Sequence, residues 1–146
     1  MPMELTILGT SSATPTTTRH PSAQVLCIKN RLFMIDCGEG TQLQCMVHGV
    51  KFQRVERVFI SHLHQDHYLG LLGIITTMNL NGRKDPLYIY GPKGLDEIME
   101  VQFKWSGIVL SYALEFFELK DDGFQTIYTD EYLEVQSFPL KHQVFF

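Results

Sequence analysis

The sequence predicts a layered α/β fold, in which strands pair into sheets and helices pack against them. The chain of 146 residues is 45% hydrophobic and 19% charged, which is enough apolar material for the core of one domain. Apolar runs of strand length recur along the chain, and stretches of helical composition lie between them. No repeat, charged run or linker divides the sequence, so we expect a single domain over residues 1–146.

The first half of the chain is predicted to contain four strands, one long loop and one helix. Residues 10–21 are rich in Ser, Thr and Pro, which break regular structure, so this segment is expected to be a loop. Two apolar runs flank Asn30-Arg31 and predict a hairpin, and a tight turn follows at residues 36–40. Gly49 occupies the position of a helix C-cap. The expected strands are Glu4–Leu8, Gln24–Lys29, Leu32–Ile35 and Val55–Ser61, and the expected helix is Thr41–His48.

The second half is predicted to begin with helices and to end with strands. Tyr68–Leu80 is apolar on nearly all sides, as a buried helix is. A strand at Leu87–Tyr90 and a helix at Gly94–Phe103 follow. From Tyr112 onward the pattern changes to strands, at Leu114–Glu118, Thr126–Tyr128, Tyr132–Ser137 and Leu140–Phe145.

Charge and cysteine usage exclude several classes of protein. A net charge of −4 excludes a protein that holds nucleic acid by overall positive charge alone, although it leaves room for a local site. The apolar stretches are too short to cross a membrane, and the N-terminus lacks a secretion signal. Cys27, Cys37 and Cys45 cannot all pair and show no C-x-x-C spacing, so we interpret them as reduced, mostly buried thiols of a cytoplasmic protein.

The segment from His62 to His67 contains four potential metal ligands within six residues, directly after a predicted strand. His62 and His64 point the same way in extended backbone, and Asp66 and His67 follow where the chain turns into a helix. Imidazole and carboxylate groups suit Zn²⁺, Mn²⁺ or Fe²⁺. Four ligands from so short a segment would strain a single ion, which favours a two-metal site. The alternative is a histidine-rich surface turn, and the clustering of three of the six histidines disfavours it.

Four blocks of sequence resemble a known family. An H-x-H-x-D-H motif after a strand is the signature of the metallo-β-lactamase superfamily, and the other blocks are similar to those of ribonuclease Z, the family of endonucleases that trim the 3′ end of precursor tRNA. The blocks occur in the order of that family and span nearly the whole chain. They are LGTSSATPT (Leu8–Thr16), FMIDCGEGTQLQ (Phe33–Gln44), FISHLHQDHYLGLLG (Phe59–Gly73) and PLKH (Pro139–His142).

The resemblance implies an αββα sandwich and a homodimeric hydrolase with two zinc ions, which removes the 3′ trailer from precursor tRNA and leaves a 3′-hydroxyl on the tRNA. Asp66 would also act as the general base that takes a proton from the attacking water. Asp36 would orient the metal-binding loop, whereas the residues alone leave open a turn or helix N-cap role for it. The implied metal ligands are His62, His64, His142, Asp66 and His67.

Two departures from the family pattern concern the substrate loop and the metal motif. Arg19 lies where the family has a loop that contacts the substrate near its 3′ end, but Thr17 and His20 replace the usual Lys and Asn, so discrimination of a CCA end is not implied. Gln65 replaces a usual Gly and needs either negative φ or strain of about 1 kcal/mol. The notable basic cluster, interpreted as a solvated face with RNA contact as the alternative, consists of Lys51, Arg54 and Arg57.

The family's remaining metal ligands lie beyond the PLKH block, which ends at His142. The chain is therefore expected to be the N-terminal half of the sandwich, truncated after the third motif and impaired when alone. Two alternatives stay open, namely a non-catalytic metal-binding half domain and another hydrolase of the superfamily, such as a phosphodiesterase or sulfatase. Exposed apolar strand edges would favour self-association.

Overall fold

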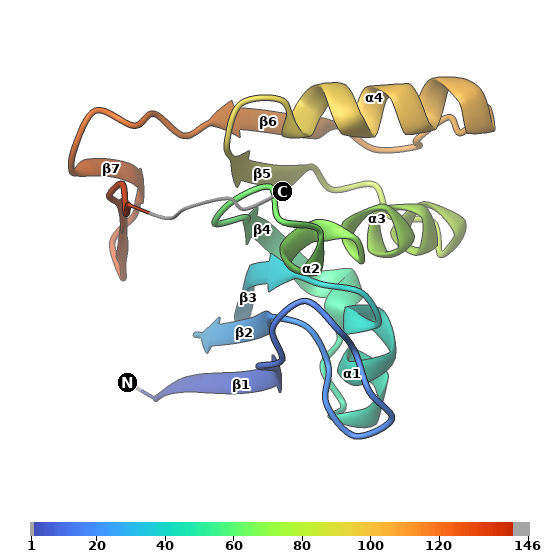
Figure 1. Cartoon of the computed structure of the whole chain (residues 1–146), viewed down its shortest axis with the longest axis horizontal. Helices are drawn as coiled ribbons and strands as arrows, with labels where there is room; N and C mark the ends of the chain where they lie inside the picture. Colours follow the sequence, from blue (N-terminus) through green and yellow to red (C-terminus); the bar gives the residue numbers. More distant parts are fainter. Residues whose placement is uncertain (1, 142–146) are drawn as a thin grey trace.

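The computed structural model describes residues 2–141, in which three strands come first, helices and strands alternate in the middle, and three strands come last (Figure 1). The mixed α/β class predicted from the sequence is confirmed. The elements are β1 (Met3–Gly9), β2 (Ala23–Ile28), β3 (Arg31–Cys37), α1 (Thr41–Val47), the 3₁₀ helix η1 (Phe52–Arg54), β4 (Val55–Phe59), α2 (Gln65–Tyr68), α3 (Leu71–Leu80), β5 (Leu87–Gly91), α4 (Leu95–Ser106), β6 (Leu114–Glu118), β7 (Gln125–Thr129) and β8 (Glu134–Ser137).

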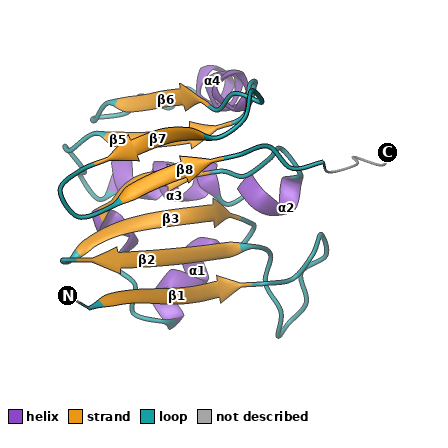
Figure 2. Cartoon of the chain, turned by 90° about the vertical axis from the view of Figure 1, so that its left-hand side faces the viewer, coloured by secondary structure: helices purple, strands orange, loops and turns teal. Residues whose placement is uncertain are grey.

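The main sheet has six strands in the order β1-β2-β3-β4-β5-β6. The first three strands are antiparallel neighbours, whereas β3 to β6 are parallel. Parallel neighbours require a crossover connection, and helices supply each of these connections. Figure 2 shows the result, because the helices lie behind the main sheet and the two-stranded sheet of β7 and β8 lies in front of it.

Each face of the main sheet has its own apolar core. The helix-covered face buries the larger core, in which Ile74 and Met78 of α3 and Leu95 of α4 are almost fully inaccessible to solvent. On the opposite face Phe33, Phe59 and Tyr90 form a smaller aromatic core beneath the hairpin of β7 and β8. The described chain thus has three layers, namely helices, main sheet and hairpin, which Figure 1 shows nearly edge-on.

Apart from the last strand, the predicted elements are present, with two differences. The turn between β2 and β3 lies at Lys29-Asn30, one residue earlier than expected, and both residues have positive φ (49° and 64°), as a type I′ turn requires. The helix expected over Tyr68–Leu80 is instead divided at Gly70 into α2 and α3. The division occurs where the Gly70 N–H donates to the Cys37 carbonyl, at 2.9 Å.

The last predicted strand, Leu140–Phe145, falls mostly outside the described residues. Leu140 and Lys141 are described and have no strand structure, while residues 142–146 lie beyond that range. Within the described residues, no helix is long and apolar enough to span a membrane.

The three cysteines are free thiols, as the sequence predicts. Cys37 and Cys45 are buried, and burial raises the pKa of both thiols, that of Cys45 to about 11. A thiol with a raised pKa is mostly protonated at neutral pH and is therefore a poor nucleophile. This supports the interpretation of these cysteines as structural residues.

Candidate metal centre

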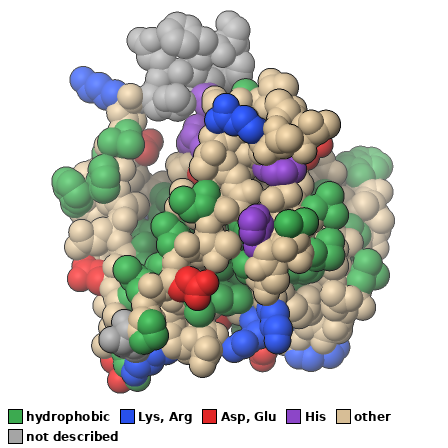
Figure 3. Space-filling model, turned by 90° about the horizontal axis from the view of Figure 1, so that it is seen from below, with side chains coloured by type: hydrophobic (Ala, Val, Ile, Leu, Met, Phe, Trp, Pro, Cys, Tyr) green, Lys and Arg blue, Asp and Glu red, His purple; other side chains and the backbone are tan. Residues whose placement is uncertain are grey.

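The histidine-rich motif lies at the carboxyl edge of the main sheet. It follows β4, which ends at Phe59, and the chain remains bound to the sheet through the Ile60 N–H, which donates to the Tyr90 carbonyl at 2.8 Å. The turn at the end of β3, residues 36–40, contains Asp36 and is called the acidic turn below. It reaches the same edge, because β3 and β4 are parallel. This is the edge at which sites in parallel sheets form. Histidine side chains come to the surface close together on one face (Figure 3).

His62 and His64 form a close imidazole pair. His64 has extended backbone at the start of α2, and the bend at Leu63 between the two histidines leaves their rings side by side. The Nε2 atom of His62 lies 2.9 Å from the Nδ1 atom of His64. The Nδ1 atom of His62 lies 3.0 Å from the Ser61 hydroxyl oxygen. The pair therefore directs two ring nitrogens toward one point.

His67 lies beside this pair and is held by two carboxylates. Its Nδ1 atom is 2.6 Å from Oδ2 of Asp36, and its Nε2 atom is 3.6 Å from Oδ2 of Asp66. Its ring centre lies 4.1 Å from that of His62. When Nδ1 donates a proton to Asp36, Nε2 presents its lone pair to the side where Asp66 lies.

Asp36 is the buried acceptor of this region, with only 6% of its surface exposed. Its Oδ1 atom accepts a hydrogen bond from the Ser61 N–H at 2.9 Å, and its Oδ2 atom accepts from the hydroxyls of Ser22 and Ser61, each at 3.1 Å. The residue has a positive φ of 56°, a strained conformation for a residue with a Cβ atom. The N-cap of α1 is Gly40, so Asp36 does not cap that helix.

Asp66 is fixed from the opposite side by the loop between β1 and β2. The Ala13 N–H donates to Oδ2 of Asp66 at 2.8 Å, and Ala13 itself has a positive φ of 55°. Burial raises the pKa of Asp66, but the Ala13 hydrogen bond and the nearby His67 lower it, and the net shift is downward. The Asp66 carboxylate is therefore ionised at neutral pH.

Sequence reasoning missed the residues that join these segments. Ser22 lies outside the four blocks, and Ala13 and Ser61 lie inside them without an assigned role, although each contacts a carboxylate of the site. Gly38 could have been noticed, because it stands inside the acidic turn. A Cβ atom at Gly38 would lie 2.3 Å from the Asp66 backbone carbonyl, so only glycine allows the two segments to approach.

The other predicted site residues have different surroundings. Arg19 is exposed, and its N–H and carbonyl close a turn with Thr16. Gln65 is the first residue of α2 and has no positive φ, so it sits in the motif without the strain that was considered for it. His142 lies outside the described residues. Of the basic cluster, Lys51 and Arg54 are exposed as expected, whereas Arg57 is largely buried at the opposite edge of the sheet.

The donor groups fit a divalent transition metal in chemistry and spacing. Nitrogen ligands about 2.0–2.1 Å from one zinc ion lie roughly 3.3 Å apart in a tetrahedral site. The facing nitrogens of His62 and His64, at 2.9 Å, are within a few tenths of an ångström of that spacing. Within residues 2–141, no three His, Cys, Asp or Glu side chains converge as a complete metal-binding group. The described part of the chain therefore provides pairs of potential metal ligands, namely His62 with His64 and Asp66 with His67.

Comparisons with known proteins agree with this geometry. The family model of the anti-Pycsar protein Apyc1 matches residues 3–134. A ribonuclease Z of Cytophaga hutchinsonii is 45% identical over 144 residues, which are 99% of this chain and 46% of that protein. The crystal structure of the short form of human tRNase Z superposes with a TM-score of 0.89 at 34% identity, covering 96% of this chain and 61% of the human one.

A metallo-β-lactamase fold protein of Bacillus subtilis, YhfI, shares the fold with a TM-score of 0.64 at 18% identity, covering 93% of this chain and 57% of that one. The fold and the histidine motif thus define a protein of the metallo-β-lactamase superfamily, homologous to ribonuclease Z over the N-terminal half of those relatives. The chain belongs to the Apyc1 family. It spans about half the length of the curated relatives it matches, 46% for the Cytophaga protein.

Proposed function

We propose that this chain contributes to the active site of a metal-dependent phosphodiesterase that removes the 3′ trailer from precursor tRNA and leaves a 3′-hydroxyl on the tRNA. The observation that carries the proposal is the convergence, at one edge of the sheet, of the His62–His64 pair with a His67 that Asp36 holds. Homology to ribonuclease Z supports the choice of tRNA. Because the chain spans about half of those relatives, the activity is proposed for the site to which these residues contribute.

The ligands proposed for the metal are imidazole nitrogens and one carboxylate. Zinc, manganese and iron in the divalent state all accept such ligands. Bound at this edge, two such ions would bring positive charge to the scissile phosphate and would lower the pKa of water. The proposed ligands are His62, His64, Asp66 and His67, with His142 as a further one outside the described residues.

The chain's own residues prepare the site in two ways. Asp36 accepts the hydrogen bond when Nδ1 of His67 carries the proton of the neutral ring, and in that tautomer Nε2 can bind a metal. Asp66 is ionised because of its lowered pKa, and it can therefore accept a proton from the attacking water. The Ala13 N–H donates to Oδ2 of Asp66, and this hydrogen bond fixes the orientation of the carboxylate.

A small phosphodiester is the second candidate substrate, and two observations favour it. The matching family model is that of Apyc1, which suggests phosphodiesterase activity. In addition, a cluster of arginines lies at the amino edge of the sheet, away from the histidine motif. Arg54 and Arg57 therefore do not lie where they could hold a polyanion against the motif.

The test uses the full chain supplied with Zn²⁺. Its metal content is measured by mass spectrometry, and it is then incubated with a 3′-extended precursor tRNA and, separately, with a cyclic mononucleotide. Asp66→Asn should slow cleavage by about 10²–10⁴-fold, because the general base is lost. The matched control is Asp122→Asn at an exposed loop position, which should cleave at the unaltered rate.

The outcomes separate the candidate functions. Cleavage of the tRNA at the base of its trailer supports the first substrate, and cleavage of the cyclic mononucleotide alone supports the second. Bound metal without cleavage of either substrate identifies a non-catalytic metal-binding half domain. Absence of bound metal in the unaltered chain contradicts all three.

We propose further that the protein is a homodimer of the cytoplasm. Helix α1 exposes an apolar face, with Leu43 61%, Met46 56% and Val47 73% accessible, and such a face is costly in water. The three free thiols fit a reducing compartment. Sedimentation equilibrium of the chain and of a Val47→Glu variant tests the dimer, and a monomeric unaltered chain contradicts it.

A further inference from the structure

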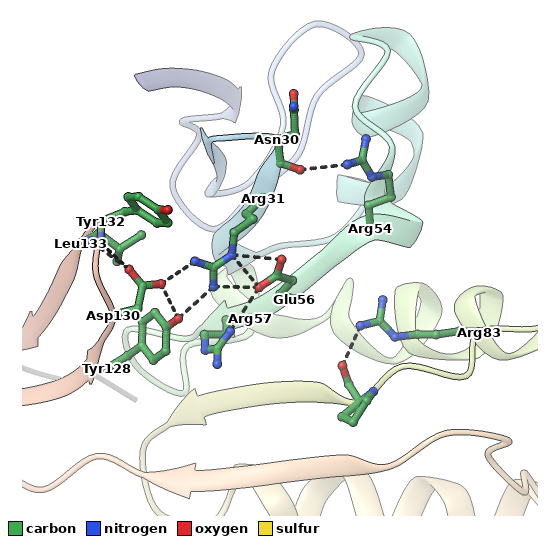
Figure 4. A network of polar contacts seen from close by, with 11 residues as sticks. Asn30, Arg31, Arg54, Glu56, Arg57, Arg83, Tyr128, Asp130, Tyr132 and Leu133 are labelled. Carbon is green, nitrogen blue, oxygen red and sulfur yellow. Dashed lines mark hydrogen bonds and ion pairs between the residues drawn. The ribbon is translucent and has the colours of Figure 1, made fainter. Parts of the chain in front are cut away.

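A second concave site lies at the opposite edge of the main sheet, where β3, β4 and β5 begin. It has a volume of about 490 Å³. The turn before β3 contributes Asn30, η1 contributes Arg54, and the segment between α3 and β5 contributes Arg83. Figure 4 shows the polar side chains of this region from close by. The pocket shares no residue with the histidine motif.

The pocket is positively charged although the chain as a whole is negative. Four arginines and two carboxylates line it, so the lining carries a net charge of +2, against −4 for the whole chain. Concentrated positive charge in a concave surface attracts anions. The charged residues of the lining are Arg31, Arg54, Arg57, Arg83, Glu56 and Asp85.

The four arginines differ in how far their charges are neutralised. Arg31 is paired with the carboxylates of Glu56 and Asp130. Arg83, in contrast, donates to the backbone carbonyls of Gln53, Asp85 and Pro86, each at 2.8 Å. These acceptors are neutral, and among residues 2–141 no carboxylate forms an ion pair with Arg83. Arg83 therefore adds a positive charge to the pocket wall that no direct ion pair neutralises, although Asp85 and Glu56 attract it at longer range.

Arg54 and Arg57 still have donors to offer. Arg54 is exposed, and its guanidinium donates through Nη2 to the Asn30 carbonyl at 3.0 Å. The Arg57 guanidinium lies 3.8 Å from the ring centre of Tyr128 and 4.7 Å from that of Tyr88, which fixes its plane. Its Nη1 donates to the Glu56 carboxylate, which Arg31 also contacts. Its Nε has no hydrogen-bond acceptor in the described structure, but this atom is buried from solvent, so the terminal nitrogens are the ones that can face the cavity.

We propose that this pocket binds a small phosphorylated molecule of about nucleotide size, with its phosphate group between Arg54 and Arg57. Planar guanidinium groups match phosphate oxygens, and two of them with unused donors border the same cavity. The volume is more than a free phosphate fills, and it lies within the range of roughly 300–1,000 Å³ of small-molecule sites. A cavity of this size, which is partly open to solvent, is large enough for a small anion, whereas an RNA backbone would extend beyond it. The proposal does not depend on the chemistry at the carboxyl edge.

The test is isothermal titration calorimetry of the full chain with AMP, inorganic phosphate and adenosine, each in the presence of a chelator. The chelator removes metal, so that phosphate held by metal at the histidine motif does not contribute. We expect AMP to bind, phosphate to bind more weakly, and adenosine to give no heat. Arg54→Gln should weaken AMP binding about tenfold, because one charge-assisted contact is lost. Lys51→Gln is the matched control, because it removes a neighbouring exposed charge outside the pocket.

A second measurement locates the bound molecule. In a ¹⁵N-labelled chain, AMP should shift the guanidinium Nε–H signal of Arg57 and leave the histidine ring signals unchanged. Absence of AMP binding overturns the proposal, and so does an equal loss in Lys51→Gln and Arg54→Gln. Phosphate that binds as tightly as AMP overturns the assignment of a nucleotide-sized ligand.

Discussion

The carboxyl edge of the main sheet carries a cluster of potential metal ligands, whereas the amino edge carries a network of ion pairs around Arg31. At the carboxyl edge, three histidines and two carboxylates lie together, and ring nitrogens of His62 and His64 face each other at 2.9 Å. At the amino edge, Arg31 is enclosed by Glu56, Asp130 and the Tyr128 hydroxyl, so charges of opposite sign neutralise one another.

This difference separates a cluster of potential metal ligands at the carboxyl edge from an ion-pair network around Arg31 that holds the layers together. Imidazole nitrogens such as those of His62 and His64 can bind a metal ion, whereas the Arg31 guanidinium carries only donors, which two carboxylates and the Tyr128 hydroxyl accept. Tyr128 belongs to β7 and Asp130 follows it, so the network ties the hairpin to β3 and β4. Four substitutions or conditions should affect one edge and spare the other.

The largest effect is expected for Asp36→Asn at the carboxyl edge. The amide cannot hold the proton-bearing Nδ1 of His67 as the carboxylate does, so zinc affinity should fall about 10–100-fold. Competition with a chromophoric chelator measures this affinity. Ser22→Ala is the control, because it removes one hydrogen bond to Asp36 and keeps the carboxylate. Unchanged zinc affinity in Asp36→Asn would show that the histidine motif does not depend on this carboxylate.

At the amino edge, Arg31→Met should lower the free energy of unfolding by about 1–2 kcal/mol, because hydrogen bonds to two carboxylates are lost and partial exposure limits their value. Urea denaturation measures the change, and Arg19→Met at an exposed position is the control. Zinc affinity should stay the same. A stability equal to that of the unaltered chain would mean that the hairpin is held by its apolar core alone.

Acid should lower the free energy of unfolding through the Asp130 contacts at the amino edge, by less than Arg31→Met does. The Tyr128 hydroxyl and the Arg31 guanidinium hold the pKa of Asp130 below its ordinary value of 3.8. A lowered pKa in the folded state gives stability that is fully present above the ordinary value and is lost as the pH falls below it toward the folded-state pKa. Urea denaturation between pH 6 and pH 2.5 should therefore show a decline that is shallower in Asp130→Asn. Identical declines in the two proteins would contradict this role.

The smallest effect is expected for Gln65→Gly within the metal motif. Gln65 begins α2 without positive φ, so glycine relieves no strain and only adds disorder to the unfolded chain. The free energy of unfolding should fall by about 0.5–1 kcal/mol. Thermal unfolding measures the change, with Gln65→Ala as the control that keeps helix propensity. A gain in stability with glycine would reveal strain in the motif after all.

Local sequence patterns predicted the elements well where the structure depends on nearby residues. The strand Leu114–Glu118 was predicted with its observed bounds from its local residue pattern, and pairing with β5 holds it in the sheet. The break at Gly70 was not predictable, because it arises from a close approach to the turn after β3, in which a Cβ atom at Gly70 would lie 2.1 Å from the Gly38 carbonyl. Such a contact joins segments that are far apart in the sequence.

The same distinction applies to the two edges. The histidine motif was recognisable because its members stand within six consecutive residues, so a short segment brings His62 and His64 together. The contacts of Ala13 with Asp66 and of Ser22 with Asp36 were not recognisable, because each joins two separate segments. The sequence by itself determined the class of fold, the family and the chemical groups of the motif. Only the tertiary structure decided that Asp36 holds His67 and that Arg57 packs against Tyr88 and Tyr128. The reason is that packing of segments distant in the sequence sets these distances.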